Sequence, residues 1–160
     1  MKKSVKKILP AWIAVMSLIC ACASRQTAES LAAPSFDLVA GKNWKLIEVR
    51  IENLKTGFSR DALGTEFSNF YTLKFQDGTI TGRAAPNNYR GPFELTKNQG
   101  ISFNKVAATL MALLKEPEGL KENEYFTYLE GIYRWDLKDN RLELHGKDAN
   151  GRTSVLVFSE

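Results

Sequence analysis

The sequence predicts an α+β domain: an antiparallel sheet or open barrel, with one buried and one amphipathic helix inserted between the strands. The sheet is predicted by three turn signals, Asp77-Gly78, Asp139-Asn140 and Asn150-Gly151, each of which separates segments of alternating apolar and polar residues. Such pairs tolerate the positive φ angles that tight hairpins need. The helices are predicted by two stretches of helical character between residues 106 and 130.

The strands follow in order along the chain. WKLIEVRI (residues 44–51) is the first, with apolar residues on both faces, and FYTLKFQ (residues 70–76) alternates clearly. TITGR follows the first turn signal, and GIYRWDLK, RLELHG and TSVLVF surround the other two. Residues 52–69 are expected to form a loop that is longer than most connections, and a loop of this length is either functional or mobile.

The two helices are expected in the middle of the chain. VAATLMALLK (residues 106–115) consists of good helix formers that are apolar almost all round, and Pro117 would end it, so we predict a buried helix. After Glu118, the residues Leu120, Tyr125 or Phe126, and Leu129 have helical spacing with acidic residues between them, which predicts an amphipathic helix.

The N-terminus has the pattern of a secretory signal. MKKSVKK is basic, and ILPAWIAVMSLIC is an apolar run shorter than the roughly 20 residues of a membrane span. Ile19, Cys20 and Ala21 before Cys22 resemble the lipobox of bacterial lipoproteins, in which the cysteine becomes the lipid-bearing mature terminus. We therefore predict cleavage between Ala21 and Cys22 and lipidation of Cys22.

Other roles for the two cysteines are less favoured. An ordinary signal peptide would leave Cys22 as an unpaired thiol, and a disulfide between Cys20 and Cys22 would be strained. A structural zinc site needs four ligands, and His145 is the only histidine. The predicted organisation is a signal peptide at 1–21, a flexible tether at 22–41 and one folded domain at 42–160.

Composition argues against nucleic-acid binding. The chain has 22 Lys and Arg against 18 Asp and Glu, but four of the lysines (Lys2, Lys3, Lys6 and Lys7) lie in the predicted signal. Without these four, 18 basic residues face 18 acidic ones. The basic balance of the whole chain is therefore no nucleic-acid signature.

Several motifs occur in an order that resembles the META-domain family of HslJ-like bacterial envelope and stress proteins. They are a first strand that begins with Trp44, then FQDGTITG, PNNYRGPFEL, TLMA, ENEYFTYLEGIYRWDL, LELHG and VLVF, and together they extend over residues 44–158. Asn87, Tyr89 and Gly91 match one family motif, and Thr109, Met111 and Ala112 match another. Where the family has cysteines, this chain has Pro86 and Leu113, so a thiol pair has no counterpart here.

The motif residues have two interpretations each. Asn87, Tyr89 and Gly91 could line a ligand cleft, but we favour a turn in which asparagine replaces backbone bonds and Tyr89 packs into the sheet. Thr109 and Met111 are interpreted as a helix cap and a core residue. No phosphate-binding loop or nucleophile elbow is present, and we expect no catalytic residue, metal or cofactor.

The resemblance implies a small domain with no established reaction. We therefore expect a non-catalytic, lipid-anchored protein of the bacterial cell envelope, attached through acyl chains on Cys22, in the outer rather than the inner membrane. Its expected role is to bind another envelope or cell-wall component or to support stress tolerance, without nucleic acid. The alternatives are a hydrolase or inhibitor with a cleft near Asn87 and Tyr89, and a surface-exposed virulence factor.

Overall fold

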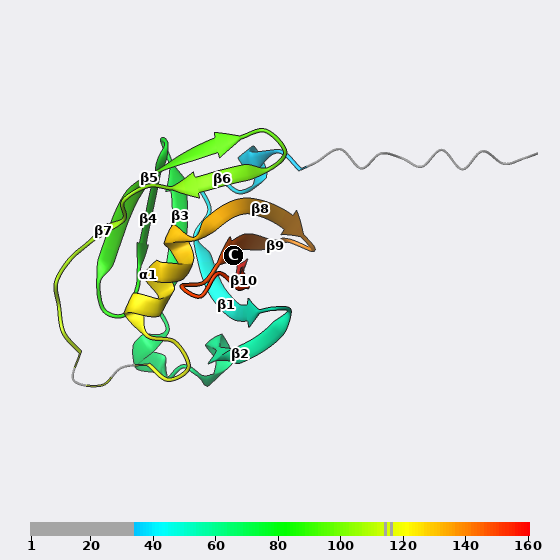
Figure 1. Cartoon of the computed structure of the whole chain (residues 1–160). Helices are drawn as coiled ribbons and strands as arrows, with labels where there is room; N and C mark the ends of the chain where they lie inside the picture. Colours follow the sequence, from blue (N-terminus) through cyan, green and yellow to red (C-terminus); the bar gives the residue numbers. More distant parts are fainter. Residues whose placement is uncertain (1–33, 114, 116) are drawn as a thin grey trace, which may run out of the picture. The chain divides into compact units, whose positions relative to one another are not determined.

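The structure, a computed structural model, describes residues 34–113, 115 and 117–160. The main feature of this part of the chain is a closed barrel of antiparallel strands in the order β1-β3-β4-β5-β6-β8-β9-β10, in which β10 pairs back with β1 (Figure 1). β2 pairs with β1 and β7 pairs with β5, both outside this ring. The bounds are β1 (Trp44–Ile51), β2 (Leu54–Ser59), β3 (Thr72–Gln76), β4 (Thr79–Arg83), β5 (Asn88–Thr96), β6 (Gly100–Phe103), β7 (Ala107–Ala108), β8 (Ile132–Lys138), β9 (Arg141–Lys147) and β10 (Thr153–Ser159).

The expected α+β class with an open sheet is therefore wrong: the domain is mostly β and its barrel is closed. Closure joins the first and last strands of the ring, with Lys45 paired to Ser159 and Ile51 to Ser154. A closed ring leaves no strand edge within it, which removes the hydrogen-bonding edges that an open sheet exposes. The alternation of residues and the turn signals predict which consecutive strands pair in a hairpin. They do not predict that the first and last strands of the ring pair with each other.

Two of the three predicted turn signals form two-residue hairpins. Asp77-Gly78 joins β3 to β4 with φ of 51° and 70°, and Asp139-Asn140 joins β8 to β9 with φ of 50° and 58°. Asn150-Gly151 lies in a longer connection between β9 and β10, where the Asp148 carboxylate accepts from the backbone N–H of Asn150 at 2.9 Å. Positive φ at both central positions is the geometry that short hairpins favour.

The segment expected as a long loop, 52–69, contains more structure than predicted. Glu52-Asn53 forms a further two-residue turn with φ of 50° and 66°, which leads into β2. The 3-10 helices η2 (Arg60–Ala62) and η3 (Thr65–Phe67) follow. The Arg60 guanidinium holds this segment on the barrel, because it donates to four backbone carbonyls, those of Leu46, Ser68, Phe70 and Tyr71.

The buried helix predicted for 106–115 is not present. The described residues of this stretch contain no helix: Ala107 and Ala108 form β7, which pairs with β5, and residues 107–112 are exposed. Leu110 is fully exposed, at 101%, and Met111 is half exposed. Helix propensity is a weak preference that tertiary contacts override, and here a strand partner and the Asn87 side chain hold the backbone extended.

The amphipathic helix is confirmed as α1 (Glu122–Glu130), which lies across the front of the barrel in Figure 1. Tyr125 and Leu129, one turn apart, are both completely buried. The Glu124 carboxylate accepts from the Lys121 N–H at 2.9 Å, which satisfies one of the free amides at the start of the helix. The apolar stripe of α1 therefore completes the core.

The core is rich in aromatic rings. The Phe36 ring lies 5.2 Å from the Phe75 ring and 5.1 Å from the Trp135 ring between centroids, both in edge-to-face geometry, which is a favoured arrangement for aromatic pairs. Phe36 belongs to the 3-10 helix η1 (Phe36–Leu38), and Val39 after it is fully buried. Both residues fall in the segment predicted as a tether, so packed structure is already present before residue 42.

We expect Gly82→Ala to destabilise the domain. A Cβ atom at Gly82 would lie 2.6 Å from the Tyr89 ring and would also meet the Thr72 carbonyl oxygen. Such overpacking costs about 1–3 kcal/mol, measurable by urea denaturation. Gly57→Ala is the matched control, since a Cβ there meets nothing within 4 Å. Equal stability of the two variants would contradict this account of Gly82.

Candidate functional site

Asn87 is the centre of a buried hydrogen-bond network. Its side chain is 4% exposed. Its Oδ1 accepts from the Thr109 hydroxyl at 2.8 Å and from the Met111 N–H at 2.7 Å. Its Nδ2 donates to the Met111 carbonyl at 3.2 Å and to Glu122 Oε2 at 2.7 Å. All four hydrogen-bonding positions of the amide are used. The Asn87 side chain thus makes hydrogen bonds to residues 109 and 111 that a neighbouring strand would otherwise make.

Glu122 connects this network to the helix. Its Oε1 accepts from the backbone N–H of Asn87 at 2.9 Å and of Ala85 at 3.1 Å. Glu122 is the first residue of α1, where the helix dipole favours a negative charge. One carboxylate thus fixes the turn between β4 and β5, the Asn87 amide and the start of α1.

Tyr89 packs inside the barrel, as the turn interpretation predicted. Its hydroxyl donates to the Thr72 carbonyl at 2.7 Å and lies 2.9 Å from the Tyr125 hydroxyl. Burial is the largest cause that raises the pKa of both phenols above the ordinary value, and the neighbouring ring raises that of Tyr89 further. Both phenols therefore stay protonated at neutral pH, where they serve as hydrogen-bonding core groups.

Gly91 permits a close approach of two backbone segments. A Cβ at this position would lie 3.2 Å from the Val106 Cα and 3.3 Å from the Lys105 carbonyl oxygen. The absence of a side chain lets the chain before β7 pass against β5. The glycine of the motif is thus explained by packing.

The second motif has a different role from the one expected. Thr109 does not cap a helix: its hydroxyl donates to Asn87. Met111 is no core residue, because its side chain is half exposed while its backbone N–H and carbonyl are bonded to Asn87. Ala112 is exposed as well. The structure thus joins the two motifs through the Asn87 amide.

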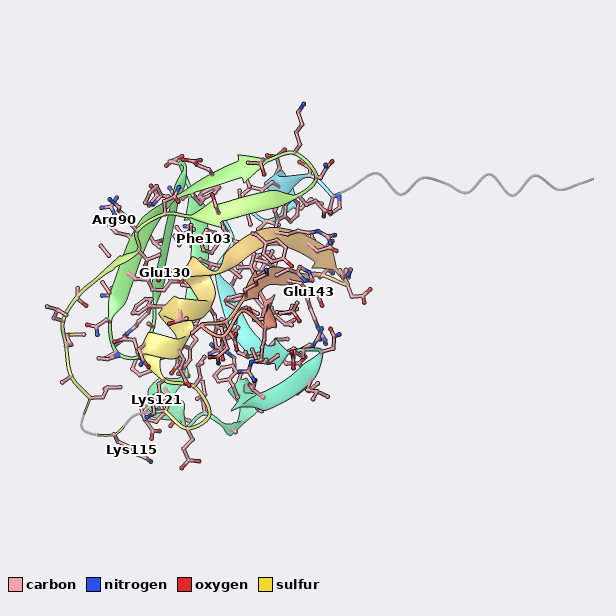
Figure 2. All side chains as sticks on the ribbon, viewed as in Figure 1. Arg90, Phe103, Lys115, Lys121, Glu130 and Glu143 are labelled. Atoms are coloured by element: carbon pink, nitrogen blue, oxygen red, sulfur yellow. The ribbon has the colours of Figure 1, made fainter. Side chains whose placement is uncertain are left out.

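An open groove of about 770 Å³ lies beside these motifs. β3, β4, β5 and β7 all contribute to it, and the residues that matter for its chemistry are Thr81, Arg83, Asn88, Arg90, Ala107 and Ala108. Alternation in β4, with Ile80 buried and Thr81 exposed, places this surface on the outside of the barrel. Figure 2 shows the Arg90 side chain on the outer side of β5, away from α1.

The groove is cationic. None of its lining residues is acidic, and in the described part of the chain no carboxylate lies within ion-pair distance of Arg83 or Arg90. Arg83 is held by a hydrogen bond from Nε to the Pro86 carbonyl at 3.3 Å, and its guanidinium lies 4.7 Å from the centre of the Phe70 ring. Guanidinium groups suit carboxylate or phosphate oxygens, which they bind in a planar, bidentate manner.

The sequence analysis missed Arg83, Arg90 and Glu122. A signal for the arginines existed, since both lie next to the Asn87 motif in RAAPNNYRG, for which a turn was the favoured interpretation. Register pairs Arg83 with Asn88 and Thr81 with Arg90, so the arginines are diagonal neighbours. Glu122 was visible in the sequence as an acidic residue near a helix start, but its partners, 35 to 37 residues away, were not.

The described residues contain no cluster of histidine, cysteine, aspartate or glutamate suited to holding a metal. In the same residues, no helix has the length and apolarity needed to cross a membrane. Ala21, Cys22 and the whole predicted signal lie outside the residues that the structure describes, so lipidation and cleavage remain predictions.

Comparison with known proteins identifies the family. The META domain profile matches residues 37–159, which is most of the chain. The chain belongs to the META domain family. This confirms the resemblance inferred from the motifs, and it assigns Asn87, Tyr89 and Thr109 to a shared domain. No curated protein matches the sequence.

Two solved structures share the fold of this META domain. One is the NMR structure of a protein from Burkholderia xenovorans, with a TM-score of 0.54 and 21% identity over 84% of this chain and 97% of that one. The other is a crystal structure of a DUF4847 family protein from Bacteroides vulgatus, with a TM-score of 0.52 and 15% identity over 78% and 95% of the two chains. At these identities the likeness concerns the fold alone.

We expect Asn87→Ala to destabilise the META domain by about 2–4 kcal/mol, because it leaves the Thr109 hydroxyl, the Met111 amide and Glu122 without their shared partner. Chemical denaturation measures the loss, and hydrogen exchange should show faster exchange of the Met111 amide. Asn88→Ala is the matched control, since Asn88 is adjacent and exposed, and should change stability by less than about 0.5 kcal/mol. Equal stability of the two variants would show that the network is not needed.

Proposed function

We propose that this META domain protein is a lipid-anchored, non-catalytic component of the bacterial cell envelope that binds another envelope component through the groove over β4, β5 and β7. The observation that carries the binding role is the groove itself, with two arginines and no acidic residue among the residues that line it. Anionic groups, carboxylates or phosphates, are the complementary chemistry. The lipobox around Cys22 supports the anchor.

The groove favours binding over catalysis. General acid–base work requires a titratable group with a suitable pKa within reach of the substrate. The strongly raised pKa values in the described residues belong to Tyr89 and Tyr125. Tyr89 is among the residues that line the groove, but it is only 3% exposed, and its hydroxyl is bonded to the Thr72 carbonyl and to the Tyr125 hydroxyl. No specific observation in the described residues favours the hydrolase hypothesis.

Attachment through acyl chains agrees with the magnitudes of membrane binding. Each buried methylene contributes about 0.8 kcal/mol, and one acyl chain alone holds a protein only marginally. Bacterial lipoproteins, which the N-terminus resembles, carry three chains on the cysteine. The groove would then act on partners close to the membrane that holds the anchor.

We expect Cys22→Ala to move the protein from the membrane fraction to the soluble fraction when the full chain is expressed in a bacterial host. Mass spectrometry of the wild type should find an acylated Cys22 as the mature N-terminus, and globomycin should cause the uncleaved precursor to accumulate. Cys20→Ala is the control, because Cys20 would leave with the signal. Membrane retention of the Cys22→Ala protein would refute the anchor.

The groove is tested by charge reversal. We expect the double variant Arg83→Glu, Arg90→Glu of the full chain to lose at least four-fifths of the partner adducts that chemical crosslinking in cells captures with the wild type, because it replaces two cations by anions. Arg141→Glu is the control, since Arg141 is exposed on β9 and does not line the groove. Unchanged adducts in the double variant would rule out the groove as the binding surface.

A further inference from the structure

The residues after Lys105 form an uncharged, exposed edge of the sheet. From 106 to 113 the sequence VAATLMAL contains no charged residue and no proline, and residues 107–112 are exposed. Leu110 is 101% exposed and Met111 51%. Natural proteins protect exposed strand edges with charges, prolines or bulges. These eight residues contain no charge and no proline to protect the edge, and their apolar composition is that of a buried segment.

The backbone of this edge faces outward at alternate residues. The Thr109 N–H donates to the Asn88 carbonyl at 3.1 Å, and the Met111 N–H and carbonyl are bonded to the Asn87 side chain. Residues 109 and 111 therefore direct their backbone groups toward β5. β7 itself comprises only Ala107 and Ala108. Because these directions alternate along a strand, we infer that the backbone groups of Ala108, and of Leu110 where the alternation continues, point away from β5. Within the described residues, β7 pairs with no strand other than β5.

One arginine lies beside this edge, and one lysine lies on either side of it in the sequence. Arg90 on β5 is paired directly with Ala107, and its side chain reaches the groove that Ala107 and Ala108 also line. Lys105 and Lys115 are both exposed, and Figure 2 shows Lys115 at the far end of the connection that follows β7. A strand added beside β7 would lie about 10 Å from β5, two strand spacings away. Arginine and glutamate side chains together span that distance, and the small alanines do not block the space between them.

We propose that residues 107–111 bind an extended segment of a partner protein as an added β-strand. The partner segment has apolar residues at its centre, next to Leu110 and Met111, and acidic residues that reach Arg90 and the flanking lysines. Backbone hydrogen bonds to Ala108 and Leu110 supply affinity, and the charges supply specificity, as in other cases of strand addition. This inference rests on the proposed function, because it names the chemistry of the envelope component that the groove binds.

A second copy of the chain fits the same edge less well. In an antiparallel self-pairing centred on Leu110, Lys105 of each copy would lie opposite Lys115 of the other. Like charges directly opposite each other destabilise paired strands. A partner segment with acidic residues opposite Lys105 and Lys115 would instead be attracted to both lysines. Charge complementarity therefore favours a different protein as the occupant.

The proposal is tested by panning a phage library of random nine-residue peptides against the full chain in detergent micelles. We expect enriched peptides with alternating apolar residues and acidic residues toward the ends. The enriched peptides are then resynthesised and their binding is measured by fluorescence anisotropy. We expect them to bind at least tenfold more weakly to the Ala108→Pro protein, which lacks an outward N–H. We expect a version of the peptide N-methylated at alternate residues to bind the wild-type protein at least tenfold more weakly as well. Ala108→Val keeps the N–H and should bind within threefold of the wild type.

Hydrogen exchange adds a readout that needs no variant. The amides of Ala108 and Leu110 should become protected when peptide binds, whereas those of Thr109 and Met111, already bonded, should change little. Arg90→Glu should weaken the acidic peptides at least fivefold, and Arg141→Glu should not. The N-methylated peptide keeps the test decisive even where the Ala108→Pro variant does not fold.

Several outcomes would overturn the proposal: no enrichment, enriched peptides without acidic residues, or equal binding of N-methylated peptide. Dimerisation of the full chain that Ala108→Pro abolishes would assign the edge to a second copy instead. The proposed function is judged separately, by the crosslinked adducts of the Arg83→Glu, Arg90→Glu variant. If those adducts depend on the arginines while Ala108→Pro leaves them unchanged, the groove binds its component and strand addition is wrong.

Discussion

The pairing of β1 with β10 is the constraint on which the rest of this domain depends. It joins residues 44–51 to residues 153–159 and closes the ring, so each strand between them must keep its place and register. Within a closed ring every strand has a partner on both sides. β2 and β7 lie outside it, and they are therefore the places where the described chain leaves strand edges open. Leu110 and Met111 follow β7 and are exposed because this part of the chain lies outside the closed ring.

The residues that mark the META domain in this sequence act mainly as supports of that edge. Asn87 bonds to residues 109 and 111, Glu122 fixes Asn87, and Gly91 lets the chain pass close to β5. Pro86 and Leu113 stand where the resemblance to the family implies cysteines. Here the two segments are joined by hydrogen bonds of a buried amide, which are strong because every donor and acceptor is satisfied.

The charge of the groove illustrates how little net charge says about a binding surface. Without its four N-terminal lysines the chain has equal numbers of acidic and basic residues, yet the groove holds two arginines and no acid among its lining residues. Arg83 and Arg90 lie on one face because the β4–β5 hairpin places them diagonally across the register. A local field of this kind governs which partners are attracted, and it can exist on a domain of zero net charge.

The sequence by itself determined the local features of this protein. Asp77-Gly78 and Asp139-Asn140 form hairpins because positive φ is a property of the turn residues themselves, and α1 forms where Tyr125 and Leu129 repeat at helical spacing. The family motifs were likewise visible in the sequence. Tertiary structure decided the closure of the barrel, the cationic groove and the extended form of residues 106–113. That stretch prefers a helix locally, but its decisive contacts come from Asn87, 22 to 24 residues earlier, and from β5. Propensity contributes at most about 1 kcal/mol per residue apart from proline, and a strand partner with a buried amide outweighs it.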